Sequence, residues 1–206
     1  MRHSVLWCGL VLLMSIPLFG QERASAQPAT RAGVAGGKEI DTQRSRITIH
    51  VGKSGLLSAA AHNHTINAPI ASGTMRESGP AEVGFTVDAA KMTVEPDPKI
   101  DAKTQATIQK DMEEMTLETG KFPQIVFRSS HIEKLPGDEW KVDGDLTLHG
   151  VTKPVSLTVK QTGDEYTTHT VLKQTDFGIK PISIGGGMIK VKNEIRLDFQ
   201  IFAAKA

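Results

Sequence analysis

Apolar and polar side chains alternate along most of the chain after residue 41. The pattern is clearest in residues 194–201, where every second side chain is apolar. A period of two is typical of β-strands that bury one face. It recurs in residues 47–51, 83–87, 125–127, 142–148 and 155–159, and less regularly in His64–Met75 and Tyr166–Lys173. The sequence therefore predicts about eight strands.

Short turns separate these segments. They are Ser78-Gly79-Pro80, Pro136-Gly137-Asp138, His149-Gly150 and Thr162-Gly163-Asp164. Reversals this short join antiparallel neighbours, because a parallel crossover needs a dozen or more residues. Antiparallel strands with one apolar face each form either a two-sheet sandwich or a closed barrel. A barrel also leaves no exposed sheet edge.

One long insertion, residues 95–122, has a different pattern. Ile108, Met112 and Met115 are spaced i, i+4 and i+7, which predicts one short amphipathic helix with these three side chains on its apolar face. Asp97-Pro98 or Asp101 would cap its start. A helix of this kind is expected to cover the sheet or to plug one end of it.

An eight-stranded barrel encloses a space that side chains can fill or that can hold one slender ligand. The alternation points one set of apolar side chains inward. These candidate ligand-binding residues are Phe85, Val87, Phe127, Leu146, Leu148, Leu157, Leu197 and Phe199. An interior of this composition would favour a long apolar ligand, whose burial stabilises the complex by roughly 0.8 kcal/mol per methylene. A solid-cored barrel that only binds a protein partner is the alternative.

The amino terminus has the features of a secretory signal peptide. Arg2 and His3 precede the apolar run Val5–Phe19, which is too short to span a membrane, and Ala24-Ser25-Ala26 is a cleavage site. We expect cleavage between Ala26 and Gln27, which removes residues 1–26 and exports the protein to the periplasm or the medium. An uncleaved anchor is the alternative. Residues 27–40 are small and aperiodic and are expected to form a flexible tether before a domain at 41–204.

Composition excludes several functions. The 206 residues include 24 Lys and Arg against 23 Asp and Glu, so the net charge of +1 gives no reason to expect nucleic acid or an anionic membrane surface as partner. The single cysteine, Cys8, lies in the expected signal peptide, which leaves no thiol chemistry and no disulfide. The oligomeric state stays open, a homodimer included.

Candidate chemistry is limited to histidines. His62 and His64 are two residues apart, so on a strand both would face the same side and could reach one metal ion or a ligand head group at the barrel mouth. A metal would need a further ligand, such as His50, His131 or His169. The alternative function is therefore a metal- or haem-binding redox accessory.

Motifs of enzymes are absent. The chain contains no Gly-x-Ser-x-Gly elbow and no His-Glu-x-x-His, and Gly185-Gly186-Gly187 lacks the Lys and Ser/Thr of a phosphate loop. Adjacent Glu113 and Glu114 diverge by about 100° on a helix and cannot flank one scissile bond. The sequence predicts neither an enzyme nor a cofactor.

Three motifs and an early histidine pair carry a family resemblance. Phe122–Ser129, Leu146–Val155 and Asp176–Gly178, with His62-Asn63-His64, resemble the YceI-like family of lipid- and polyisoprenoid-binding proteins over about residues 39–202. The resemblance implies an extended lipocalin-like antiparallel barrel, a periplasmic location and a long isoprenoid or similar amphiphile bound inside, without a cofactor or established catalysis. Leu146–Val155 itself is interpreted as a reversal between two strands.

Overall fold

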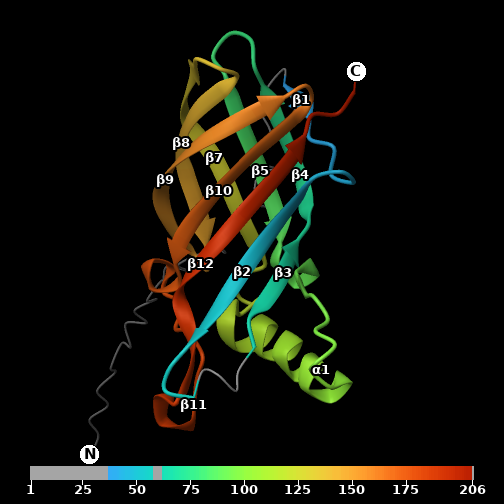
Figure 1. Cartoon of the computed structure of the whole chain (residues 1–206). Coiled ribbons are helices and arrows are strands. Elements are labelled where there is room, and N and C mark those ends of the chain that lie inside the picture. Colours follow the sequence, from blue (N-terminus) through green and yellow to red (C-terminus); the bar gives the residue numbers. More distant parts are fainter. Residues whose placement is uncertain (1–36, 58–61, 206) are drawn as a thin grey trace, which may run out of the picture. The chain divides into compact units, whose positions relative to one another are not determined.

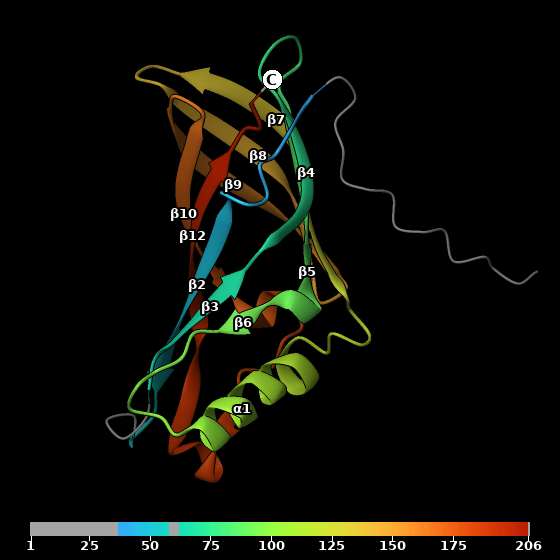
Figure 2. The same cartoon turned by 90° about the vertical axis from the view of Figure 1, so that its right-hand side faces the viewer.

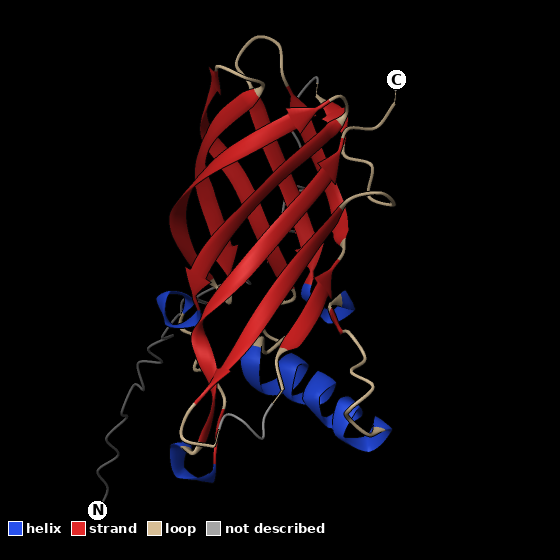
Figure 3. Ribbon diagram, viewed as in Figure 1, coloured by secondary structure: helices blue, strands red, loops and turns tan. Residues whose placement is uncertain are grey.

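The described part of the chain forms one antiparallel sheet curled into a barrel, with a single α-helix at one end (Figures 1 and 3). This computed structural model describes residues 37–57 and 62–205, all of which lie in the unit Arg31–Ala206. The expected signal peptide, its cleavage site between Ala26 and Gln27, and residues 27–36 lie outside the described residues. None of the helices within the described ranges has the length and apolar character needed to cross a membrane.

Every pairing between the strands is antiparallel, as predicted. The order across the sheet is β1-β4-β5-β7-β8-β9-β10-β12-β2-β3-β6, and β11 pairs with β12. The strands are β1 (Lys38–Glu39), β2 (Arg46–Ser54), β3 (His64–Ala68), β4 (Ile70–Arg76), β5 (Glu82–Asp88), β6 (Thr93–Val94), β7 (Gln124–Leu135), β8 (Glu139–Leu148), β9 (Val151–Thr162), β10 (Glu165–Lys173), β11 (Ser183–Ile184) and β12 (Ile189–Phe202).

The barrel closes through a strand that is broken at a proline. The sequence predicted one strand over His64–Met75, and the structure divides it at Pro69 into β3 and β4. Proline has no N–H to donate, so the ladder is interrupted there. β3 pairs with β2 while β4 pairs with β5, which joins the two ends of the sheet. The described residues form twelve strands rather than about eight, because this segment is divided and three two-residue strands, β1, β6 and β11, are added; with β3 and β4 taken as one, eight longer strands remain.

Residues 38–40, which the sequence assigned to the tether, belong to the barrel. β1 pairs with β4, the Ile40 N–H donates to the Gly73 carbonyl (2.9 Å), and the Asp41 N–H donates to the Phe202 carbonyl (2.8 Å). The side chain of Ile40 is buried. These residues fill the edge between β4 and β12. Two strand residues are too few to produce a visible alternation.

The insertion contains helix α1 (Ala102–Asp111), whose first turn is capped by Asp101 through the N–H groups of Lys103 and Thr104. A π-helical turn, η3 (Met112–Thr116), follows directly. A π-helical turn holds more residues than an α-helical turn, so it changes which side chains face the barrel. Met112 is buried, but the side chain of Met115 is 65% exposed. The predicted position of Met115 on the apolar face is therefore wrong.

Short 3-10 turns complete the fold. They are η2 (Ala89–Lys91), η4 (Gln174–Phe177) and η5 (Gly185–Gly187). The last turn contains the three glycines and links β11 to β12 in a hairpin. Both β11 and η5 lie at the same end of the barrel as α1 (Figures 1 and 2). We call this the helix end, and the opposite end, with the turns at residues 77–81, 136–138 and 163–164, the turn end.

Candidate functional site: an apolar interior in two parts

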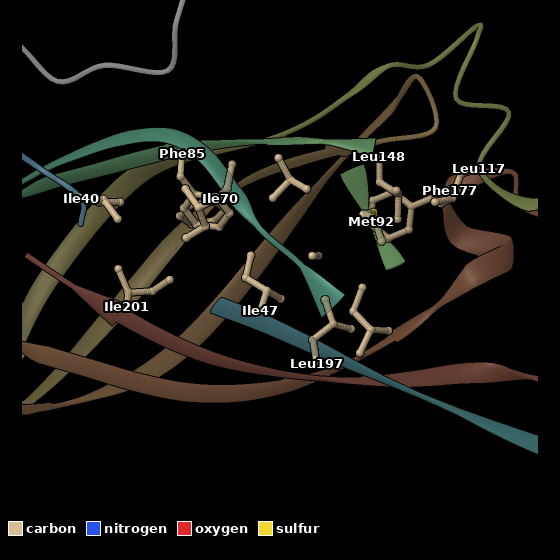
Figure 4. Close-up of a cluster of buried hydrophobic side chains, with 14 of the residues drawn as sticks. Ile40, Ile47, Ile70, Phe85, Met92, Leu117, Leu148, Phe177, Leu197 and Ile201 are labelled. Carbon is tan, nitrogen blue, oxygen red and sulfur yellow. The ribbon is translucent and has the colours of Figure 1, made fainter. Parts of the chain in front are cut away.

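A cavity of about 160 Å³ lies inside the barrel towards the helix end. All eight side chains predicted to point inward line it: Phe85, Val87, Phe127, Leu146, Leu148, Leu157, Leu197 and Phe199. Helix α1 contributes Ile108, and Met112 and Leu117 follow from the next turn, so the insertion closes this end of the interior as expected. Several of these side chains converge in Figure 4. Whether they contact a ligand stays a prediction.

A second cavity of about 90 Å³ continues the interior towards the turn end. Phe85, Phe127, Leu157 and Phe199 line both cavities. The rings of Phe85 and Phe127 stack with their centroids 5.4 Å apart, and the Phe199 ring lies 6.4 Å from that of Phe85. These four side chains form a wall across the barrel, which we call the aromatic partition.

The two histidines occupy different environments at the helix end. His64 begins β3 and lines the larger cavity, while His62 precedes the strand and its Nδ1 lies 3.1 Å from the Asp97 carboxylate. Burial lowers the pKa of the His64 imidazole, and the neighbouring His62 lowers it further. The Lys99 N–H and the His62 ring hold the pKa of Asp97 below its ordinary value. His64 is thus the histidine that would meet a molecule inside the barrel.

The other histidines considered as metal ligands lie away from this pair or have partners of their own. Within residues 37–57 and 62–205, no group of three or more His, Cys, Asp or Glu side chains is placed to hold a metal ion. Of the additional histidines considered from the sequence, His50 lies beside Asp198, with its Nε2 2.8 Å from the carboxylate. His131 and His169 are exposed on β7 and β10.

Sequence reasoning missed a polar cluster beside the second cavity. The Tyr166 hydroxyl donates to Glu77 (2.6 Å) and accepts from the Gln161 amide (3.0 Å), while the Trp140 indole N–H donates to Gln161 (2.8 Å). Burial and the Glu77 carboxylate raise the pKa of Tyr166. The only signal in the sequence was that a half-buried Tyr or Trp needs a polar partner. The partner itself is 89 residues away along the chain.

The motifs that suggested the family meet in space. The Phe122 ring lies 4.3 Å from the His149 imidazole, and a Cβ at Gly150 would come within 2.6 Å of the Phe122 ring. His149 and Gly150 both have positive φ angles in a two-residue turn between β8 and β9. This confirms the strand reversal expected for Leu146–Val155. The turn needs glycine because a side chain would collide with the ring.

Comparison with known proteins agrees with this geometry. A model of the YceI-like domain matches residues 39–203, which is most of the chain. The chain belongs to the YceI-like family. Among solved structures, the YceI-like barrel superposes on BcnA from Burkholderia cenocepacia with a TM-score of 0.59 at 17% identity, over 80% of this chain and 99% of that one. A polyisoprenoid binding domain from Saccharophagus degradans gives a TM-score of 0.55 at 14% identity, over 82% and 99% of the two chains. At these identities the likeness shows the shared fold.

Curated relatives of this YceI-like chain match over a shorter segment. Protein YceI from Escherichia coli O157:H7 is 53% identical over 47 residues, which is 23% of this chain and 24% of the relative. Protein YceI from Shigella flexneri gives the same identity and coverage. The matched segment thus spans about a quarter of the length of these relatives.

Proposed function

We propose that this protein is a non-catalytic binding protein that holds one long apolar chain, a polyisoprenoid or a similar lipid, inside its barrel. The observation that carries the proposal is the composition of the larger cavity. Only four of the described residues that line it are polar, namely His64, Thr116, Thr170 and Gln174, and none of them is an acid, a lysine or an arginine. Such a wall offers nothing to a charged chain and gives favourable burial to an apolar one. The Saccharophagus neighbour, a polyisoprenoid binding domain, supports the isoprenoid class.

The volume of the cavity limits how a long apolar ligand can bind. An engineered apolar cavity of about 150 Å³ binds benzene, so a cavity of about 160 Å³ is too small for a long chain. The ligand must therefore occupy both cavities, and the side chains of the aromatic partition must rotate to let it pass. Each methylene moved from water into this interior contributes roughly 0.8 kcal/mol.

The ligand's polar head lies at the helix end, beside His64. A neutral imidazole both donates and accepts a hydrogen bond, so it suits a hydroxyl or a pyrophosphate-like group. The lowered pKa of His64 favours this neutral form. His62, fixed by Asp97, stands next to it.

The protein works in the periplasm after removal of the signal peptide at residues 1–26, with secretion as the alternative. This location rests on the basic start, short apolar run and cleavage site at Ala26-Gln27.

Ligand retention in variants tests the proposal. The protein is expressed from the full chain, purified from a bacterial periplasm without detergent and extracted with solvent. Phe127→Asp, which places a charge inside the cavity, should lose the extracted lipid. Val171→Asp places the same charge on the exposed outer face of β10 and should keep it. Thr170→Phe fills the cavity without adding charge and should also lose the lipid. Undiminished lipid in folded Phe127→Asp and Thr170→Phe would refute an interior site.

A further inference from the structure

The helix end carries an exposed apolar projection formed by two segments. Residues 53–57 end β2 and enter its following loop, and residues 183–192 comprise β11, η5 and the start of β12. Pairing of Lys53 with Val191 and donation from the Leu57 N–H to the Met188 carbonyl (2.9 Å) hold the two segments together. We call these residues the tip. In Figures 1 and 2 the tip lies at the far extreme of the barrel, at the same end as α1.

Exposed hydrophobic side chains concentrate in the tip. Of the six large hydrophobic side chains that are exposed in the described part of the chain, four belong to it: Leu56 (87%), Leu57 (45%), Ile184 (61%) and Met188 (44%). Apolar side chains gathered in this way mark a surface that another apolar phase or partner covers.

The charge of the tip points to one class of partner. Lys53, Lys190 and Lys192 lie within it, and residues 53–57 and 183–192 include no aspartate or glutamate. Neither Lys190 nor Lys192 forms an ion pair with another described residue. Apolar side chains flanked by lysines match a bilayer with anionic head groups, where the apolar side chains enter the interface and the lysines meet the lipid charge. The near-neutral net charge of the whole chain hides this local excess.

A second copy of the chain fits this surface less well. A two-fold dimer places the same patch of both copies face to face. The lysines of one tip would then approach those of the other, and like charges at short range oppose association. A bilayer has no such conflict.

The tip is continuous with the larger cavity. The Val191 N–H donates to the Ile182 carbonyl (2.9 Å), and both of these side chains line that cavity. Val191 lies between Lys190 and Lys192 along β12. A tip seated on a bilayer would therefore hold this end of the interior against the membrane from which an apolar chain would come.

We propose that the tip docks the protein reversibly on an anionic lipid bilayer so that the ligand passes between membrane and barrel. The passage of a ligand between membrane and barrel rests on the proposed function. The docking itself depends only on the tip. Each lysine at such a surface is expected to add about fivefold to the affinity, and added salt should weaken that part of the binding.

Cosedimentation with vesicles tests the docking. Protein expressed from the full chain is mixed with vesicles of phosphatidylcholine, with or without phosphatidylglycerol. Wild type should bind the anionic vesicles more strongly than the neutral ones. The double variant Leu56→Asp with Ile184→Asp should lose this binding, and Lys190→Glu with Lys192→Glu should weaken it by more than tenfold. Val171→Asp, a single change of an exposed apolar side chain to aspartate on the barrel wall, should bind like wild type. All these proteins share one amino terminus, so their differences report the tip.

The same samples are extracted for lipid, which separates this inference from the proposed function. Tip variants that keep extracted lipid but no longer bind vesicles support docking as a separate property. If the wild-type protein carries lipid but does not bind anionic vesicles, the docking is refuted and the proposed function is retained. A dimer that dissociates in Leu56→Asp with Ile184→Asp, without vesicle binding by wild type, would instead assign the tip to a second copy and also overturn it.

Discussion

The ring of Phe127 packs against the backbone of Gly144, which has no side chain to hinder this approach. A Cβ built at Gly144 would lie 2.7 Å from Cζ of Phe127 and 2.5 Å from the Arg128 carbonyl oxygen. Gly144 lies on β8, opposite Ser129 of β7, next to an irregularity in the pairing of these strands. Glycine in a strand often marks such a close approach. The position of Phe127 in the aromatic partition thus depends on this glycine.

Gly144→Ala should therefore destabilise the barrel. Overpacking of this kind typically costs 1–3 kcal/mol, about what we expect here. The measurement is the free energy of unfolding in urea. Gly120→Ala is the matched control, because no atom of the described residues lies within 4 Å of a Cβ there, and it should be neutral or stabilise by about 0.4–1 kcal/mol. Equal stability of the two variants would mean that the contact with Phe127 is not a constraint.

The aromatic partition should limit the length of the bound chain. Phe85→Ala removes a ring shared by both cavities and joins them, at a stability cost of about 3–5 kcal/mol. The variant should bind longer chains than wild type does. The measurement is competition of fatty alcohols of increasing length against a fluorescent apolar probe. Phe122→Ala is the control, because this ring packs on His149 and lines neither cavity. It should leave the length preference unchanged. An unchanged length preference in Phe85→Ala would contradict a role of the partition.

Loss of the helix cap should loosen the cover of the larger cavity. Asp101 accepts from the N–H groups of Lys103 and Thr104, both at 3.0 Å. Asp101→Ala should cost about 1 kcal/mol and raise the rate of ligand release, because α1 and η3 close that end of the interior. Glu114→Ala, at an exposed site near the end of the same helical segment, is the control. Release at the wild-type rate despite the lost stability would show that the ligand does not leave past the helix.

Alternation alone predicted which side chains line the interior, since a one-residue slip in a strand would turn its apolar residues outward. It could not predict Met115, because the exchange of an α-helical turn for the π-helical turn at Met112–Thr116 leaves no mark on the apolar spacing. It also could not predict that Pro69 divides one strand into two that pair with different neighbours. These features depend on contacts with other elements.

The sequence could not predict the polar cluster or the tip either, because each is formed by residues that are far apart along the chain. Glu77 and Tyr166 meet only because β4 ends and β10 begins at the same rim of the barrel. Likewise, Leu56 and Ile184 belong to one surface only because β2 pairs with β12. Net charge and composition average over such local groupings, so neither could indicate a basic apolar tip in a nearly neutral chain.

Acid should destabilise the folded protein through His64. Burial and His62 lower the pKa of this imidazole below its ordinary value of 6.5, against a smaller opposite effect of Asp97. Between the lowered pKa and 6.5 the unfolded chain binds a proton that the folded chain does not, so stability falls as the pH drops below about 6.5. His64→Gln should flatten this part of the pH profile of the melting temperature. His169→Gln, at an exposed position, should leave it unchanged, and equal profiles for wild type and His64→Gln would exclude His64 as the cause.

Native mass spectrometry of the wild-type protein tests the central claim most directly. The protein is purified from a bacterial periplasm without detergent, weighed intact and then extracted with solvent. The account predicts a mass above that of the chain by one ligand, which extracts as a long isoprenoid or acyl species. A bare chain without extractable lipid, or a metal or haem adduct that is lost in His62→Ala, would contradict it.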